Sequence, residues 1–263
     1  MAESVAIPAE RRRLILETIR DSGQAVAAEL AQRFGCSDDT IRRDLDRLAA
    51  EGKAQRVHGG ALRRHEAVPP YAARQATDVE AKAAIAATAA ALIRDDAVVV
   101  LDGGTTCLQL AARLRPDLRA TIVTPSPSAA EVLAGYPGIR VELLGGRLLP
   151  ETMATVGPTA LEALARVRPD VCVLGLCGVH PEAGVTVANA DERDVKAAML
   201  RHAVEVVALV GASKLGAVLP FVVGPAERLT RLVVDADAEE GQLAPYRRLG
   251  VDAIRAPRER TLA

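Results

Sequence analysis

The sequence predicts two domains: a small winged helix-turn-helix over residues 1–64 and a larger, mostly parallel α/β domain over residues 80–263. Three observations lead to this prediction. A capped, arginine-bearing helix is followed by a glycine and a short basic segment, residues 65–79 have the composition of a linker, and apolar runs alternate with helical stretches beyond them. The 263 residues suffice for two hydrophobic cores.

The first domain is centred on a helix that is predicted to begin after Ser37. The Ser37 hydroxyl suits an N-cap, and Asp38 and Asp39 give the first turn the acidic character that a helix dipole favours. Three apolar residues recur at helical spacing while three arginines project from other faces: Ile41, Leu45 and Leu48, and Arg42, Arg43 and Arg47. One face is therefore expected to pack in a core and another to meet DNA.

The segments on either side complete the motif. A helix is predicted over residues 9–22 and a second, short helix over residues 26–34, and Gly35-Cys36 supplies the turn before the central helix. Gly52 is expected to end that helix, and residues 55–61 to form a short basic wing. Three helices, a tight turn and a wing make up a winged helix-turn-helix.

Arginine pairs on a helix usually mark a solvated face, so the charges alone do not predict DNA binding. The ordered set of helices, tight turn, capped central helix and basic wing does predict DNA binding. Residues 40–64 hold seven Arg and Lys against three Asp and Glu, a net charge of +4 in a chain whose total is −1, which suits a module that reads a defined site. Arg42 and Arg43 are expected in the major groove, and Arg56 and His58 mainly at phosphates. The predicted DNA-binding residues are Ser37, Thr40, Arg42, Arg43, Arg47, Arg56 and His58.

The second domain is predicted from alternating strands and helices. Apolar runs indicate buried strands near residues 97–102, 121–124, 140–144, 170–174, 204–210, 231–234 and 251–254. Helices are predicted near residues 80–94, 105–114, 127–134, 158–165 and 191–202. This order is typical of a mostly parallel sheet covered on both faces, where ligands bind beyond the carboxyl ends of the strands.

Polar loops follow three of these strands. Residues 102–106 offer free N–H groups and hydroxyls at a helix start, which suits a phosphate, although a tight turn requires glycines as well. Thr124 and Ser126 repeat the arrangement. Ser213 and Lys214 add a hydroxyl and the leading candidate for a cation that neutralises a phosphate.

One charged pair admits two interpretations. Glu192 and Lys196 are spaced to stabilise their own helix, and they are equally placed to serve a ligand site. The predicted ligand-binding residues are Asp102, Gly103, Gly104, Thr105, Thr106, Thr124, Ser126, Glu192, Lys196, Ser213 and Lys214.

The chain resembles the DeoR family of bacterial transcriptional regulators over about residues 9–235. The N-terminal part carries S-x-x-T-I-R-R-D-L-x-x-L and R-V-H-G-G-A, and the C-terminal part carries D-x-G-T-T, T-x-S, E-x-x-x-K and S-K-x-G. The resemblance implies a repressor of carbohydrate-metabolism genes, released from operator DNA by a phosphorylated sugar or sugar-like effector. It also implies a homodimer or homotetramer whose sensor domain has the fold of ribose-5-phosphate isomerase and glucosamine-6-phosphate deaminase.

The chain departs from the family at one loop, and other functions stay open. Where the family commonly has Thr-Asn-Ser, this chain has Thr124-Pro125-Ser126, and proline removes an amide side chain and a backbone donor. One alternative is a sugar-phosphate isomerase or deaminase with a DNA-binding appendage, for which Asp191 or Glu192 would shuttle the proton. Another is an activator, or a regulator with an unphosphorylated effector.

Composition argues against several other classes. The four cysteines and four histidines are scattered, so neither a metal site nor a disulfide framework is predicted, and no cofactor is expected. The sequence offers no uncharged apolar run long enough to span a membrane and no apolar leader. A cytoplasmic protein is therefore expected, and the family resemblance implies a regulator without catalytic residues.

Overall fold

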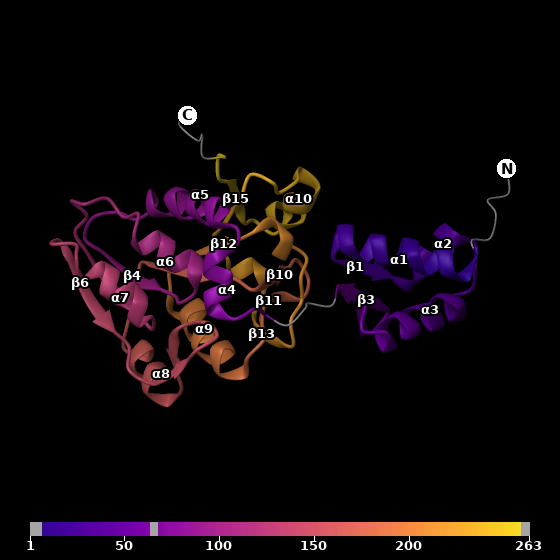
Figure 1. The fold of residues 1–263 in the computed structure, drawn as a ribbon, viewed down its shortest axis with the longest axis horizontal. Coiled ribbons are helices and arrows are strands. Elements are labelled where there is room, and N and C mark those ends of the chain that lie inside the picture. The colour runs from indigo at the N-terminus through magenta and orange to yellow at the C-terminus, as the bar shows by residue number, and fades with distance from the viewer. Residues whose placement is uncertain (1–6, 64–67, 259–263) are drawn as a thin grey trace.

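The computed structural model describes residues 7–63 and 68–258. Figure 1 shows two bodies, a small one built from the N-terminal helices and a larger α/β body formed by the rest of the chain. The predicted domain boundary at residue 64 lies outside the described residues. The fold class predicted from the sequence, a winged helix-turn-helix followed by a mostly parallel α/β domain, is confirmed.

The N-terminal domain has three helices and a three-stranded sheet. Its elements are α1 (Pro8–Ser22), β1 (Gln24–Val26), α2 (Ala27–Phe34), α3 (Asp38–Ala50), β2 (Ala54–Val57) and β3 (Gly60–Arg63). The strands lie in the order β1-β3-β2, so that β2 and β3 form the wing and β1 extends it. The core contains Ile15 of α1 and Ile41, Leu45 and Leu48 of α3, all at most 1% exposed, which confirms the predicted apolar face.

The larger domain is organised by a seven-stranded sheet in the order β15-β14-β12-β9-β4-β5-β6, with every pair of neighbours parallel. The strands are β4 (Ala97–Leu101), β5 (Ala120–Thr124), β6 (Ile139–Leu143), β9 (Val171–Gly175), β12 (Glu205–Val210), β14 (Arg231–Val234) and β15 (Asp252–Arg255). The helices are α4 (Tyr71–Ala76), α5 (Val79–Ala90), α6 (Thr105–Ala111), α7 (Pro127–Leu133), α8 (Pro158–Ala165), α9 (Ala190–His202) and α10 (Glu240–Arg248).

Each face of this sheet has its own hydrophobic core. Along β9, Cys172 and Leu174 pack into the cluster that includes α9 and α10, whereas Val171 and Val173 pack into the cluster that includes α5 and α6. This alternation follows from the two-residue repeat of a strand. The apolar runs of the sequence are nearly continuous because both faces are buried.

The structure adds elements that the sequence did not predict. The strands β10 (Gly178–His180), β11 (Gly184–Val187) and β13 (Phe221–Gly224) form an antiparallel sheet, and β7 (Arg147–Leu149) pairs with β8 (Ala154–Val156). The segment predicted as a linker contains the helix α4. Among the described residues, no helix is both long and apolar enough to cross a membrane.

Candidate functional site: a DNA-reading helix and a sensor cavity

The recognition helix α3 begins as predicted. The Ser37 hydroxyl accepts a hydrogen bond from the backbone N–H of Thr40 at 3.3 Å, and the two hydroxyl oxygens lie 2.9 Å apart. Gly35 adopts the left-handed conformation (φ +61°) that ends α2 and allows the tight turn between the helices. The local structure of the helix-turn-helix is therefore encoded by this short stretch of sequence.

The predicted DNA-contacting arginines of α3 lie on its solvent-exposed surface. Arg42 is 60% exposed and only 3.7 Å from Asp39, and Arg47 is 64% exposed and donates to Glu51 at 3.2 Å. Arg43 is exposed as well. Exposed ion pairs of this kind contribute little to stability, so these guanidinium groups can exchange their partners for phosphate or base edges at small cost.

Asp44 is a residue of this helix whose role the sequence reasoning missed. Its carboxylate is buried and accepts from Arg11 Nε at 2.6 Å and from Arg12 Nη1 at 3.2 Å, so it joins α3 to α1. The signal was available, because Asp44 lies at helical spacing on the same face as Ile41, Leu45 and Leu48. A charged residue on a buried face requires a partner.

The wing is attached to the recognition helix through Arg56. Its Nε donates to Asp46 Oδ1 at 2.6 Å, and its Nη1 donates to the carbonyls of Val57 and Gly60. His58 is exposed in the β2–β3 turn beside Gly59, whose φ is +81°. Arg56 therefore has a structural role in the free protein, and the predicted phosphate contacts of Arg56 and His58 stay predictions.

In the α/β domain, the loop of residues 102–106 lies at the carboxyl end of β4 and opens α6. Gly104 has a φ of +98°, and its N–H donates to the carbonyl of Thr152 at 3.0 Å. A Cβ on Gly103 would lie 2.7 Å from the Cβ of Ala154. Gly103 is thus required by the close approach of Thr152 and Ala154, and Gly104 by its left-handed backbone.

Beneath this loop lies a buried group of three charges that joins β4 to α9. Lys196 Nζ donates to Asp102 Oδ2 and to the Gly175 carbonyl at 2.7 Å, and it lies 3.5 Å from Glu192 Oε1. Burial alone lowers the pKa of Lys196, but the two carboxylates outweigh it and raise that pKa above its ordinary value. Burial raises the pKa of Glu192. All three side chains are at most 9% exposed, so the group forms a buried floor beneath the loop of residues 102–106.

The hydroxyls after β5 are used within the fold. Thr124 Oγ1 accepts from the N–H of Ser126 at 3.1 Å, and Ser126 Oγ accepts from the N–H of Ala129 at 3.3 Å as the N-cap of α7. The carbonyl of Pro125 accepts from the N–H of Thr155 at 2.7 Å. These side chains are buried, and they do not line the cavity described next.

A cavity of about 220 Å³ brings three of the predicted ligand-binding residues together. Thr106 comes from α6, and Ser213 and Lys214 come from the 3-10 turn η1 (Ala212–Lys214) after β12. The Asp235 carboxylate accepts from the N–H of Ala212 at 2.7 Å and so fixes this turn. Burial, together with the nearby positive charges of Arg74 and Lys196, lowers the pKa of Lys214.

The sequence analysis missed two further cations: Lys82, which lines this cavity, and Arg74, whose charge acts on Lys214 without lining the cavity. The ammonium of Lys82, in α5, donates to the carbonyls of Arg74 and Thr77, which joins α5 to α4. Burial, then the charges of Lys214 and Arg74, lowers the pKa of Lys82. A lysine within an alanine-rich helix was the available signal for Lys82. Arg74 was hidden because its segment resembles a linker.

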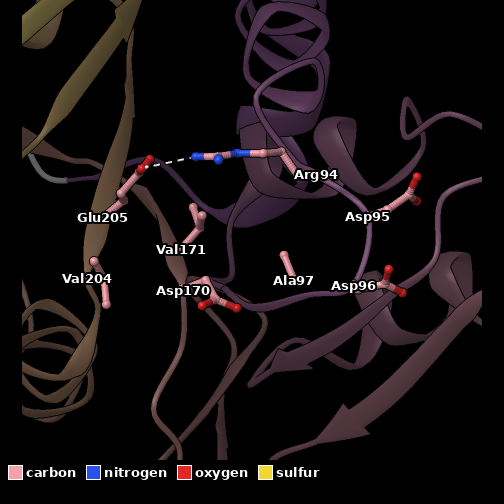
Figure 2. Close-up of a pocket in the computed structure, with 8 residues that line it drawn as sticks. All are labelled: Arg94, Asp95, Asp96, Ala97, Asp170, Val171, Val204 and Glu205. Atoms are coloured by element: carbon pink, nitrogen blue, oxygen red, sulfur yellow. Dashed lines mark hydrogen bonds and ion pairs between the residues drawn. The ribbon is translucent and has the colours of Figure 1, made fainter.

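A second, larger cavity of about 390 Å³ lies at the opposite, amino-terminal ends of β4, β9 and β12. Figure 2 shows its lining, with Arg94 reaching across to Glu205 at 3.4 Å. Its other carboxylates are engaged too: Asp170 accepts from the N–H of Val98 at 2.8 Å, and Asp95 pairs with Arg115. Because parallel sheets bind ligands at their carboxyl ends, the cavity at Lys214 is the better candidate.

Comparison with known proteins gives the same division of the chain. Residues 11–67 match the DeoR-like helix-turn-helix domain, and residues 77–236 match the DeoR C-terminal sensor domain. The chain belongs to the DeoR family. It is a DNA-binding transcriptional regulator with a C-terminal sensor domain.

Curated relatives span most of this DeoR-family chain. The transcriptional regulator GlpR of Haloferax volcanii is 36% identical over 80% of this chain and 83% of its own length. The repressor GlcR of Bacillus subtilis is 32% identical over 86% and 88%, and the glycerol-3-phosphate regulon repressor of Escherichia coli K12 is 30% identical over 79% and 82%. Among solved structures, a ribose 5-phosphate isomerase A of Methanocaldococcus jannaschii aligns over 53% of both chains, with a TM-score of 0.37 and 19% identity.

Proposed function

We propose that this DeoR-family protein is a repressor that leaves its operator when a phosphorylated sugar or sugar-like metabolite occupies the cavity at Lys214. The observation that carries the proposal is the arrangement of Lys82 and Lys214 in one cavity with the hydroxyls of Thr106 and Ser213. A phosphate needs a cation as well as hydrogen-bond donors, because donors alone do not neutralise its charge. The name of one relative, the glycerol-3-phosphate regulon repressor of Escherichia coli K12, agrees with such an effector.

The cavity also offers groups for the rest of such a molecule. Asp78, Asp235 and Asp237 also line it, and carboxylates accept hydrogen bonds from sugar hydroxyls. A volume of about 220 Å³ suits a small phosphorylated metabolite. In this proposal Thr106, Ser213 and Lys214 contact the effector, whereas the buried residues Asp102, Gly103, Glu192 and Lys196 shape the floor behind them.

DNA release follows from linkage between the two sites. An effector lowers operator affinity only by the difference between its affinities for the released and the DNA-bound forms. Converting a nearly fully competent population to a nearly fully incompetent one takes about 5.5 kcal/mol of such difference. Symmetric operators are read by symmetric proteins, so the proposal includes a homodimer or homotetramer acting on chromosomal DNA in the cytoplasm.

A thermal-shift screen of the full chain against sugar phosphates tests the ligand class. A ligand present at 100 times its Kd stabilises the folded protein by about 2.7 kcal/mol. We expect stabilisation by at least one sugar phosphate, its loss in Lys214→Met, and no effect of the matching unphosphorylated sugar. Stabilisation of Lys214→Met equal to that of the wild type would place the effector elsewhere.

The alternative of an enzyme requires a carboxylate that is free to move a proton. Glu192 does not line the cavity and lies 3.5 Å from the buried ammonium of Lys196, while Asp191 pairs with Arg147 on the surface. Neither geometry favours a proton shuttle next to a ligand. An assay across pentose and hexose phosphates tests this directly, because turnover that is lost in Glu192→Gln would overturn the proposal.

A further inference from the structure

The two domains of the chain meet at a pair of glycines. Gly23 follows α1 and Gly216 follows the turn η1, and both have left-handed backbones, with φ of +80° and +75°. A Cβ on Gly23 would lie 2.6 Å from the carbonyl oxygen of Gly216 and 2.8 Å from its Cα. The two backbones are therefore packed directly against one another, and there is no room for a side chain at Gly23.

On the sensor side, the contact belongs to the same loop as the cavity. Ser213 and Lys214 line the cavity, and Gly216 comes two residues after Lys214. Successive backbone hydrogen bonds make this loop compact: Lys214 N–H to Gly211, Leu215 N–H to Ala212 and Ala217 N–H to Lys214, at 2.9, 3.1 and 3.3 Å. A displacement of Lys214 is therefore transmitted to Gly216 rather than absorbed between them.

The far end of the loop is held by the sensor domain. The N–H of Gly216 donates to the carbonyl of Val179 at 2.8 Å and also lies 3.2 Å from the hydroxyl of Tyr246, which itself donates to that carbonyl. Tyr246 is buried, and burial raises its pKa to about 12, so the hydroxyl stays protonated at neutral pH. These contacts give Gly216 a defined position in the sensor domain, so a displacement of Gly216 is a change from one fixed arrangement.

On the DNA side, the contact leads into the wing. Gly23 is followed at once by β1, which pairs with β3 from Gln24 opposite Leu62 to Val26 opposite Gly60. The N–H of Ala27 donates to the carbonyl of Gly59 at 2.8 Å. A displacement of Gly23 therefore moves β1 and, through this ladder, the wing that carries His58.

We infer that the contact between Gly216 and Gly23 couples the sensor cavity to the wing within one chain. A ligand that draws the Lys214 loop toward Lys82 moves Gly216 and so shifts β1 and the wing. The inference rests on the proposed function for the identity of the ligand, but the mechanical link between loop and wing is testable without any ligand.

The test measures amide hydrogen exchange of β1 and β3 in the full chain. Lys214→Glu places a carboxylate near Lys82 and so mimics an anion that draws the loop inward. We expect exchange in β1 and β3 to change by about fivefold or more, the lower end of typical allosteric coupling. Unchanged exchange would overturn the inference.

Glycine variants supply the control. Gly23→Ala breaks the contact, so Lys214→Glu should no longer alter the wing in that background. Gly35→Ala imposes similar backbone strain, at φ +61°, where a Cβ meets no atom within 4 Å, so the response should persist. An equal response in both backgrounds would overturn the inference.

A second pair of variants approaches the contact from the sensor side and serves if Gly23→Ala does not fold. Gly216→Ala should abolish the response, whereas Gly250→Ala, with φ +83° and no atom within 4 Å of its Cβ, should preserve it. Sugar phosphates are absent from all these measurements. If the cavity bound no sugar phosphate, the coupling between the Lys214 loop and the wing would still be measurable. The proposed function and the coupling can therefore fail independently of each other.

Discussion

The Asp44 carboxylate of α3 lies 2.6 Å from Nε of Arg11 in α1, and both side chains are buried. Arg12 completes the arrangement at 3.2 Å. The helix that we expect to read DNA is thus oriented by a charge on its inner face, while its outer arginines are left exposed. The same short stretch of sequence therefore encodes both the position of the helix and its binding surface.

This relationship predicts a large loss of stability in Asp44→Ala. Removing Asp44 breaks a buried pair of charges, which costs about 3–5 kcal/mol in comparable cases. Urea unfolding of the full chain measures the difference. Asp39→Ala is the matched control, because it removes an acidic residue of the same helix that is 75% exposed and 3.7 Å from Arg42. Equal unfolding free energies for the two variants would contradict the prediction.

Operator binding should depend on Arg43 and Arg56 in different ways. A bidentate contact from Arg43 to guanine contributes about 1–3 kcal/mol of discrimination, so Arg43→Ala should weaken binding and relax the preference at one base pair. Arg56→Ala should weaken binding to all sequences and reduce the salt dependence. Titrations at several salt concentrations measure both effects, with the exposed sensor-domain variant Arg140→Ala as control. Wild-type affinity and salt slope in both variants would refute the DNA interface.

The stability of the α/β domain should fall in mild acid because of His180. Its Nδ1 accepts from the N–H groups of Glu182 and Ala183 at 3.1 Å each, and burial lowers its pKa. The unfolded chain then binds a proton that the folded state excludes, so the free energy of unfolding falls as the pH drops below about 6.5. His180→Asn retains an acceptor without a titration. A pH dependence identical in the variant and the wild type would refute this cause.

Two variants, one at the partner of Lys196 and one at Lys214, should separate the effect on stability from the effect on ligand binding. Asp102→Asn weakens the pairing of the buried ammonium of Lys196, so we expect a marked loss of unfolding free energy. Lys214→Met removes a cation whose pKa burial already lowers, so stability should be retained while phosphate binding is lost. Chemical unfolding and thermal shift with sugar phosphates measure the two effects. If Asp102→Asn abolished phosphate binding and Lys214→Met lowered stability, Lys196 would be the ligand-binding lysine and Lys214 the structural one.

The sequence predicted the elements that local patterns determine. The strands β4, β9 and β12 have near-continuous apolar runs because both of their faces are buried. Gly35 ends α2 and Ser37 begins α3, so they mark the two ends of the turn in the helix-turn-helix. The strands β7 and β8 and the three strands of the antiparallel sheet were missed because all five have only three or four residues. Strands this short carry little pattern of their own, and the pairing of β11 with β13 also joins segments more than 30 residues apart.

The candidate site was predicted only in part, for a related reason. Lys214 and Thr106 were found because they follow strands of the sheet, where ligand loops are expected. Lys82 reaches the same cavity from α5, and Arg74, in a segment that resembles a linker, lies close enough for its charge to lower the pKa of Lys214. Only the folded arrangement brings these cations together with Lys214. The ion pair between Lys196 and Asp102 was likewise beyond the sequence, since spacing alone does not identify a partner 94 positions away.

The central claim is that occupation of the Lys214 cavity by a sugar phosphate releases operator DNA. Operator affinity of the full-length wild type and of Lys214→Met, titrated with the same sugar phosphates, tests it most directly. We predict a loss of wild-type affinity of about 5- to 150-fold for at least one compound, and no loss for Lys214→Met at the same concentration. An equal response of the two proteins, or wild-type affinity that no sugar phosphate changes, would contradict the account.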